Sequence, residues 1–163
     1  MNVQPKTAPT PQAWLPPRIV VRTAWTIHRR LYALTGGRLG LRPASDKQWG
    51  MMRLKTVGRK SGKERQVILG YYEDGPNLVT MAMNGWGDAE PAWWLNLQAQ
   101  PETTVVLNDG SRAVRGRAAT AEERPRLWER WGDYDGPDKL DSWASRRSRE
   151  TAVVILEPVR AAE

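Results

Sequence analysis

Cysteine is absent from the 163-residue sequence, and histidine occurs only once, as His28. Without cysteine the chain has no disulfide framework and no thiolate metal site. A single histidine also argues against a histidine-based metal centre and against a Ser-His-Asp triad. His28 is expected on a helix face rather than in a site. We therefore predict that the protein binds no metal.

Long apolar runs are also missing. No stretch of the sequence is apolar for long enough to span a membrane. Prolines interrupt the N-terminal region where the apolar core of a signal peptide would lie. They are Pro5, Pro9, Pro11, Pro16 and Pro17. The absence of a signal peptide and the absence of cysteine are typical of a cytoplasmic protein, and this is the location that we predict.

Phenylalanine does not occur, whereas nine tryptophans do. Several of these large rings are expected to line a cavity or to form the core, because each buries a large apolar surface. The length of the chain suits one domain with a core of its own.

Negative charge is scarce in the first part of the chain. Residues 1–65 carry 14 Lys+Arg and 2 Asp+Glu, a balance of +12, whereas residues 66–163 carry 11 and 16, a balance of −5. The basic part is expected to attract an anion, and the candidates are a phosphorylated cofactor, nucleic acid and acidic lipid. We predict no nucleic-acid partner, because the sequence contains no recognisable nucleic-acid module and its C-terminal part is acidic.

The N-terminal region is predicted to lie outside the main domain. Residues 1–17 are rich in proline and polar residues, as in a disordered tail. Residues 18–37 are predicted to form a basic amphipathic helix that ends at a pair of glycines. Such a helix can contact the inner face of a membrane through residues 18–35, or it can pack on its own domain. Residues 38–163 are predicted to form the main domain.

About six strands with helices around them are expected in this domain. Met51–Thr56 alternates apolar and basic residues, whereas Val67–Tyr72 is a nearly continuous apolar run, as in a strand buried on both faces. Asn108–Ser111 is typical of a hairpin turn. The other predicted strands cover residues 78–83, 103–107, 112–119 and 151–156, and the predicted helices cover 91–99, 120–131 and 138–147. Antiparallel strands with peripheral helices predict a small β-barrel.

The segment Lys55–Arg65 is the most informative stretch of the sequence. Gly58 and Gly62 stand between two predicted strands, and glycine can adopt a positive φ, so the backbone amides could turn inward as an anion-binding nest. The cations around them are Arg59, Lys60, Lys63 and Arg65. Such a turn suits a phosphate or a string of carboxylates. The alternative is a solvated hairpin turn. The glycine spacing excludes a Walker A loop.

A second irregular segment begins at Asn84–Gly85, where a predicted strand ends. The helix that follows, Pro91–Ala99, would place Trp93 and Asn96 on one face. A helix N-terminus beside a glycine loop favours anions. The alternative is that the tryptophans of this helix form the core.

Taken in order, these motifs resemble the family of deazaflavin-dependent nitroreductases and F420H2-dependent quinone reductases. The stretches that carry the resemblance are Leu31–Gly40, Thr56–Gly62, Met83–Gly85 with Pro91–Leu97, Gln100–Val105 and Ser148–Glu150. The resemblance implies a mainly β, split-barrel fold of the FMN-binding type and the use of reduced coenzyme F420. It also implies that the chain can form a homodimer, since split barrels often pair.

The resemblance further implies a site. The tail of the cofactor would be held by Lys55, Thr56, Gly58, Arg59, Lys60, Ser61, Gly62 and Arg65, and its ring would be flanked by Asn84, Gly85, Pro91, Trp93 and Asn96. A planar aromatic substrate such as a quinone or a nitroaromatic would meet Trp94, Tyr134 and Trp143. Tyr134 is the candidate proton donor, with water as the alternative. The family often has Lys at position 84 and Tyr at position 94, so we expect an altered substrate pocket.

Two other functions are compatible with the sequence. One is a split barrel that binds FMN or heme instead of coenzyme F420. The other is a module without enzymatic activity that binds anions or a membrane surface through its basic part.

Overall fold

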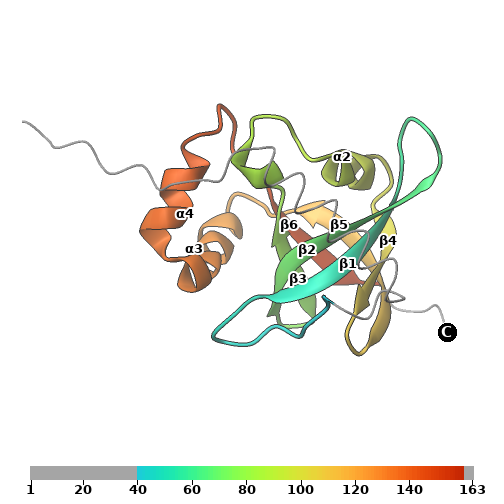
Figure 1. Cartoon of the computed structure of the whole chain (residues 1–163), viewed down its shortest axis with the longest axis horizontal. Helices are drawn as coiled ribbons and strands as arrows, with labels where there is room; N and C mark the ends of the chain where they lie inside the picture. Colours follow the sequence, from blue (N-terminus) through green and yellow to red (C-terminus); the bar gives the residue numbers. More distant parts are fainter. Residues whose placement is uncertain (1–39, 160–163) are drawn as a thin grey trace, which may run out of the picture.

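The structure, a computed structural model, describes residues 40–159 of the chain (Figure 1). The predicted tail at 1–17, the predicted basic helix at 18–37 with its membrane contact, and His28 lie outside the described residues. In residues 40–159 no helix combines the length and the apolar character needed to cross a membrane.

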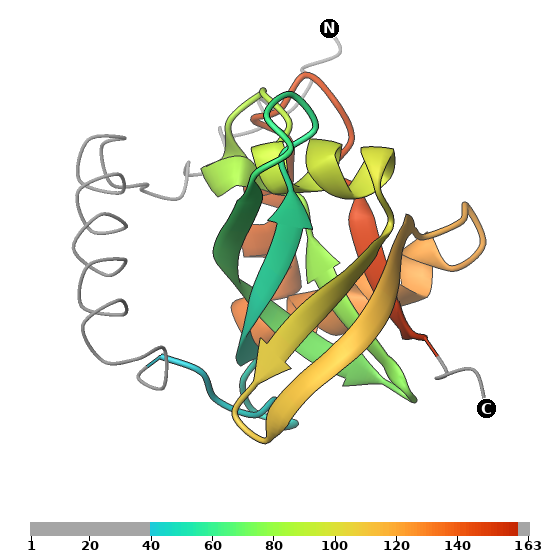
Figure 2. The same cartoon turned by 90° about the vertical axis from the view of Figure 1, so that its right-hand side faces the viewer.

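Six antiparallel strands close into a barrel in the order β1-β2-β3-β6-β5-β4 (Figures 1 and 2). The strands are β1 (Gly50–Val57), β2 (Glu64–Asp74), β3 (Asn77–Met81), β4 (Glu102–Leu107), β5 (Gly110–Ala118) and β6 (Val153–Pro158). The helical elements are η1 (Asn84–Trp86), α2 (Ala92–Ala99), α3 (Arg124–Asp135) and α4 (Pro137–Ala144). The predicted fold class is therefore confirmed.

Alternation along the strands separates two cores. In β1, Met52 and Leu54 point into the barrel, whereas Arg53 and Lys55 face outward, as the sequence pattern predicts. In β2, Tyr71 belongs to the core inside the barrel and Tyr72 to a second core beneath α3 and α4. Both tyrosines are buried, so this end of β2 is covered on both faces, as predicted.

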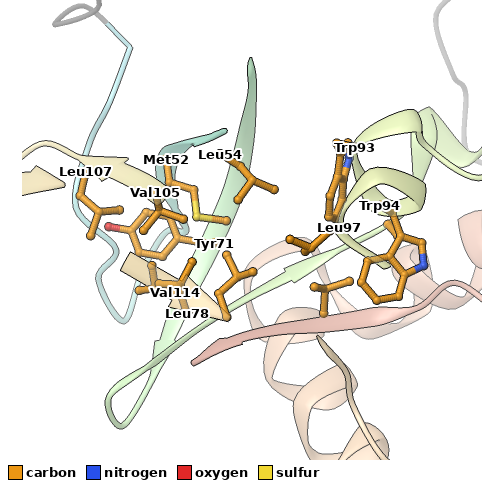
Figure 3. Close-up of a cluster of buried hydrophobic side chains, with 13 residues drawn as sticks. Met52, Leu54, Tyr71, Leu78, Trp93, Trp94, Leu97, Val105, Leu107 and Val114 are labelled. Atoms are coloured by element: carbon orange, nitrogen blue, oxygen red, sulfur yellow. The ribbon is translucent and has the colours of Figure 1, made fainter. Parts of the chain in front are cut away.

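Helix α2 lies across one end of the barrel and closes its core (Figure 2). Trp93, Trp94 and Leu97 pack with the side chains that fill the barrel (Figure 3). A close approach of α2 to β5 is possible because position 116 is glycine. A Cβ atom there would lie 2.8 Å from Cγ of Leu97. The tryptophans of α2 are therefore core residues, which was the alternative that the sequence left open.

The predicted boundaries around Tyr134 were wrong. The sequence predicted a helix that ends near Trp131 and a loop that holds Tyr134, but α3 continues to Asp135. Gly132 does not end the helix. Its position is buried against Pro137, and the chain turns only at Gly136, which has φ 87°. The second helix ends at Ala144 instead of Arg147, and β3 ends at Met81 instead of Met83.

The start of α3 is fixed by a reciprocal pair of hydrogen bonds. The backbone amide of Glu123 donates to Oγ1 of Thr120 over 3.2 Å, and the amide of Thr120 donates to a carboxylate oxygen of Glu123 over 2.8 Å. Thr120 and Glu123, three positions apart in the sequence, therefore form a capping box. The box fixes the first turn of α3, and α3 contributes Leu127 and Trp131 to the second core.

Candidate functional site

Three segments with predicted site residues meet at one end of the barrel. They are the turn between β1 and β2 (residues 58–63), helix α2, and the segment 82–91 that joins β3 to α2 (Figure 2). They meet because β1, β3 and α2 are joined through an antiparallel barrel, in which every second strand ends on the same side. We call this end the α2 end of the barrel.

The backbone of the turn at 58–63 is bonded internally. The amide of Gly58 donates to the carbonyl of Lys63 over 2.8 Å, and the amides of Ser61 and Gly62 donate to the carbonyl of Gly58 over 3.0 and 2.7 Å. Gly62 has the expected positive φ, 65°, but Gly58 does not. The predicted nest of inward amides is therefore wrong, because the turn uses these amides for its own closure. Binding of an anion at this turn would therefore depend on its cationic side chains.

Asn96 of α2 holds this turn in place. Its side-chain oxygen accepts a hydrogen bond of 3.1 Å from the amide of Arg59, and its side-chain nitrogen donates to Oγ1 of Thr56 over 3.3 Å. Asn96 is buried. The resemblance assigned Asn96 to the ring of the cofactor, whereas the contacts that the structure gives it are with the predicted tail site.

The cations of the turn extend into solvent. Arg59, Lys60, Lys63 and Arg65 are all exposed. Lys55 pairs with Glu64 at 3.5 Å. A hydrogen bond from Gln66, together with the charge of Lys55, holds the pKa of Glu64 below its usual value. Three exposed cations on a closed, fixed turn, with Arg65 beside them at the start of β2, match the charge of a phosphate and polyglutamate tail, so the residues present fit that part of the cofactor.

The segment 82–91 contains a strained turn. Asn84, Gly85 and Trp86 have φ values of 46°, 59° and 62°, so η1 is left-handed. This conformation costs little for glycine and much more for tryptophan. Trp86 is buried and packs on Trp143, with ring centroids 6.0 Å apart. The structure thus brings predicted ring and substrate residues, Gly85 and Trp143, to the same region.

Arg147 is a residue of this region that the sequence did not identify. Its guanidinium is buried and donates from Nη1 to the carbonyl of Ala82 over 2.9 Å and to Oγ1 of Thr151 over 2.8 Å. Its Nη2 lies 3.6 Å from Glu90. Next to it, the amide of Ser148 donates to Asp88 over 2.6 Å and lowers the pKa of that carboxyl. Arg147 is one of four arginines between positions 146 and 160, and nothing in the sequence marks it as the buried one.

Tyr134 is not brought to the α2 end. Its ring packs on Trp49 and Tyr72, and the guanidinium of Arg130 lies 5.3 Å from its centroid. Trp49 precedes β1, whereas the cationic turn follows it, and a strand of this length spans roughly 25 Å. The role of Tyr134 as a proton donor stays a prediction.

Comparison with known proteins identifies relatives of this chain. The family model described as F420H(2)-dependent quinone reductase matches residues 21–158. Rv3178 of Mycobacterium tuberculosis, provisionally named an F420H(2)-dependent quinone reductase, is 38% identical over 64% of this chain and 87% of its own length. The F420H(2)-dependent quinone reductase Rv1261c of the same organism is 27% identical over 80% of this chain and 87% of its own length.

Solved structures show the same fold. An F420-H2 dependent reductase, FDR-A, has a TM-score of 0.57 and 26% identity, and the match covers 66% of this chain and 93% of that one. A chain solved as a domain-swapped dimer has a TM-score of 0.61 and 25% identity, with 83% of this chain and 99% of that one covered. The heme storage protein HutZ from Vibrio cholerae, 8% identical with a TM-score of 0.51, shares the fold alone.

These matches confirm the predictions of an F420-dependent reductase and of coenzyme F420 as its cofactor. The chain belongs to the F420H(2)-dependent quinone reductase family.

Proposed function

We propose that this protein transfers a hydride from reduced coenzyme F420 to a planar electrophilic substrate such as a quinone or a nitroaromatic. When bound, the reduced coenzyme supplies the hydride. The observation that carries the proposal is the fixed cationic turn at 58–63, which lies at the same end of the barrel as the strained segment 82–91.

The tail of the cofactor would be held by cationic side chains. Arg59 and Lys60 project from a turn whose backbone is closed on itself and tied to Asn96. The turn therefore loses little conformational freedom when it binds an anion, and long-range attraction by the exposed cations adds to the rate of encounter. Thr56 and Ser61 support the turn, and Lys55 and Arg65 extend the positive surface.

The ring would lie against the segment 82–91. Asn84, Gly85 and Pro91 would flank it, with Trp93 beneath them as part of the closed core. A buried tryptophan pair, Trp93 and Trp94, keeps water out of the barrel from this side. Trp143, packed on Trp86, would form one wall for the substrate.

We propose water as the source of the proton that the product needs. Tyr134 is the competing donor, but its ring is engaged by Trp49 and Tyr72 on the outer face of the barrel, away from the cationic turn. Replacing Tyr134 with phenylalanine is expected to leave kcat within about twofold, and a much larger loss would restore Tyr134 as the donor.

A homodimer is part of the proposal as well, because a chain with the same fold was solved as a domain-swapped dimer. Light scattering of the full chain would measure its mass in solution. Membrane contact through residues 18–35 stays a prediction from the sequence, and flotation with anionic vesicles of the full chain and of a chain lacking residues 1–35 would test it.

The deciding experiment is a fluorescence titration with oxidised coenzyme F420. We expect micromolar or tighter binding by the wild type and a loss of at least about 30-fold in Arg59→Ala/Lys60→Ala, because each charge-assisted contact contributes about 1.5–3 kcal/mol. Added salt should weaken binding by the wild type more than binding by the variant.

The matched control is Lys47→Ala/Arg112→Ala, which removes two exposed cations from the opposite end of the barrel. We expect binding within about twofold of the wild type. Uptake of FMN or heme without binding of coenzyme F420 would replace the proposal with a barrel that uses a different cofactor. Equal losses in the variant and the control would show only an effect of net charge.

A further inference from the structure

We propose that Arg147 is a positioning residue, whose buried guanidinium holds the segment 82–90, and with it the left-handed turn Asn84–Trp86, in the conformation that receives the cofactor ring. This inference rests on the proposed function. Arg147 would act through the backbone and through Glu90, without touching the cofactor or the substrate.

Contacts with the C-terminal part of the chain fix the segment 82–90 along its length. Arg147 bonds the carbonyl of Ala82 at one end over 2.9 Å and pairs with Glu90 at the other end at 3.6 Å. Between them, the amide of Ser148 bonds Asp88 over 2.6 Å. We call residues 147 and 148 the clasp. Because the segment is fixed at both ends and near its middle, the conformation of residues 84–86 depends on the clasp.

The clasp is tied to the barrel at a separate point. Arg147 uses the same Nη1 to bond Oγ1 of Thr151, directly before β6. The carbonyl of Ala152 in turn accepts the amide of Ala82 over 2.9 Å. The segment 82–90 is therefore fixed to residues directly before β6, and so to the sheet, as well as to the neighbouring loop.

The burial of this charge needs a reason beyond stability. The guanidinium is fully buried, and within residues 40–159 neither its Nε nor its Nη2 has a hydrogen-bond partner; the same holds for Oε2 of Glu90. A buried ion pair of this kind often stabilises a fold less than apolar residues of the same size would. What the pair supplies is a directional link between two ends of one segment.

The segment itself needs such a link. Asn84 and Trp86 have positive φ values. Residues other than glycine keep this left-handed backbone conformation only when the surrounding structure imposes it. Packing of Trp86 on Trp143 is one such restraint. A second is the hydrogen bond of 2.8 Å that the side-chain nitrogen of Asn84 donates to the carbonyl of Ala89. The clasp is the third, and it is the one that ties both ends of the segment to the C-terminal part of the chain.

The test compares Arg147→Met with the wild type. We expect the dissociation constant of oxidised coenzyme F420 to stay within about threefold, because the turn at 58–63 is untouched. We expect kcat to fall by about 10- to 100-fold, since small misplacements of reacting groups have effects of this size. Amide hydrogen exchange should become faster in residues 83–90 and stay unchanged in β1 and β4.

Arg124→Met is the matched control. Arg124 is also partly buried and bonds the carbonyl of Thr151 over 2.7 Å, but it approaches from α3 and pairs with Glu150. We expect kcat within about twofold and no change in exchange at 83–90. The double variant Arg147→Met/Glu90→Leu leaves no lone buried charge, so it should fold even if Arg147→Met does not, and it should still lose kcat.

The outcomes separate the two proposals. If the wild type neither binds coenzyme F420 nor reduces a quinone with it, the proposed function fails. If the wild type is active but Arg147→Met and the double variant both keep kcat within twofold, the positioning role alone is overturned. Faster exchange over the whole barrel, with a loss of activity that matches the unfolded fraction, would also overturn it, because Arg147 would then be a structural residue.

Discussion

Two ion pairs at the same end of the barrel have nearly equal lengths and very different surroundings. Lys55 and Glu64 pair at 3.5 Å beside the cationic turn, with side chains 35% and 56% exposed. Arg147 and Glu90 pair at 3.6 Å, with side chains 0% and 18% exposed. Water screens the first pair and competes with it, whereas the second pair has lost most of its hydration. The first can therefore be exchanged for a ligand, and the second acts as a fixed joint.

The largest expected difference comes from removing one carboxylate of each pair. Glu90→Leu leaves the guanidinium of Arg147 buried without its counter-charge, and we expect unfolding in urea to require about 3–5 kcal/mol less free energy. Glu64→Leu, the matched change in the exposed pair, should change the stability much less, because water screens that pair. Similar losses in the two variants would contradict the distinction between the pairs.

The next effect tests whether the exposed turn depends on the core below it. Gly116→Ala places a methyl group against Leu97 of α2, and we expect a loss of about 1–3 kcal/mol. Because α2 carries Asn96, binding of coenzyme F420 should also weaken. In Gly70→Ala the new methyl group would meet Trp49 at 3.5 Å, an ordinary contact, so this control should stay close to the wild type.

A smaller effect is expected from the link between α2 and the turn. Asn96→Ala removes the acceptor for the amide of Arg59 and the donor to Thr56. We expect a loss of about 1 kcal/mol in stability, and binding of coenzyme F420 about fivefold weaker by fluorescence. Gln98→Ala, on the exposed side of the same helix, should change neither. Unchanged affinity in Asn96→Ala would show that the turn holds its shape alone.

The smallest expected effect is the response of the segment 84–90 to acidic pH. The amide of Ser148 holds the pKa of Asp88 below its ordinary value. A lowered folded-state pKa contributes stability above the unfolded value of about 3.9, and this contribution disappears as the pH falls through the folded pKa. We therefore expect amide exchange at 84–90, corrected for its intrinsic pH dependence, to accelerate below about pH 4.

Asp88→Asn supplies the control for that measurement. The amide cannot ionise, so the exchange at 84–90 should start faster at pH 7 and show less change on acidification. An acid response of the same size in this variant would assign the effect to another group.

Local sequence patterns were sufficient to predict most of the barrel. The alternation in β1 identified Met52 and Leu54 as inward, and the residues around Gly110 marked the hairpin between β4 and β5. Thr120 and Glu123 marked the start of α3. Each of these signals arises from neighbouring residues along the chain, so no knowledge of the fold was needed.

Other features depended on packing. Gly132 marked the expected end of α3, yet the helix continues to Asp135, and position 132 packs against Pro137. The amides of the turn at 58–63 were expected to face an anion, but they bond within the turn and to Asn96, which is distant in sequence. A backbone amide can donate either to a bound anion or to an acceptor within the protein, and the folded structure decides which of the two is in reach.

The sequence by itself determined the order of the strands along the chain, the cationic turn and, through its motifs, the family and the cofactor class. The tertiary structure decided which charges are exposed and which are buried. Arg59 and Arg147 carry the same guanidinium, but only the closure of the barrel leaves one in water and places the other between Ala82, Glu90 and Thr151. The energy of a charge depends on its hydration, and hydration depends on contacts between residues far apart in sequence.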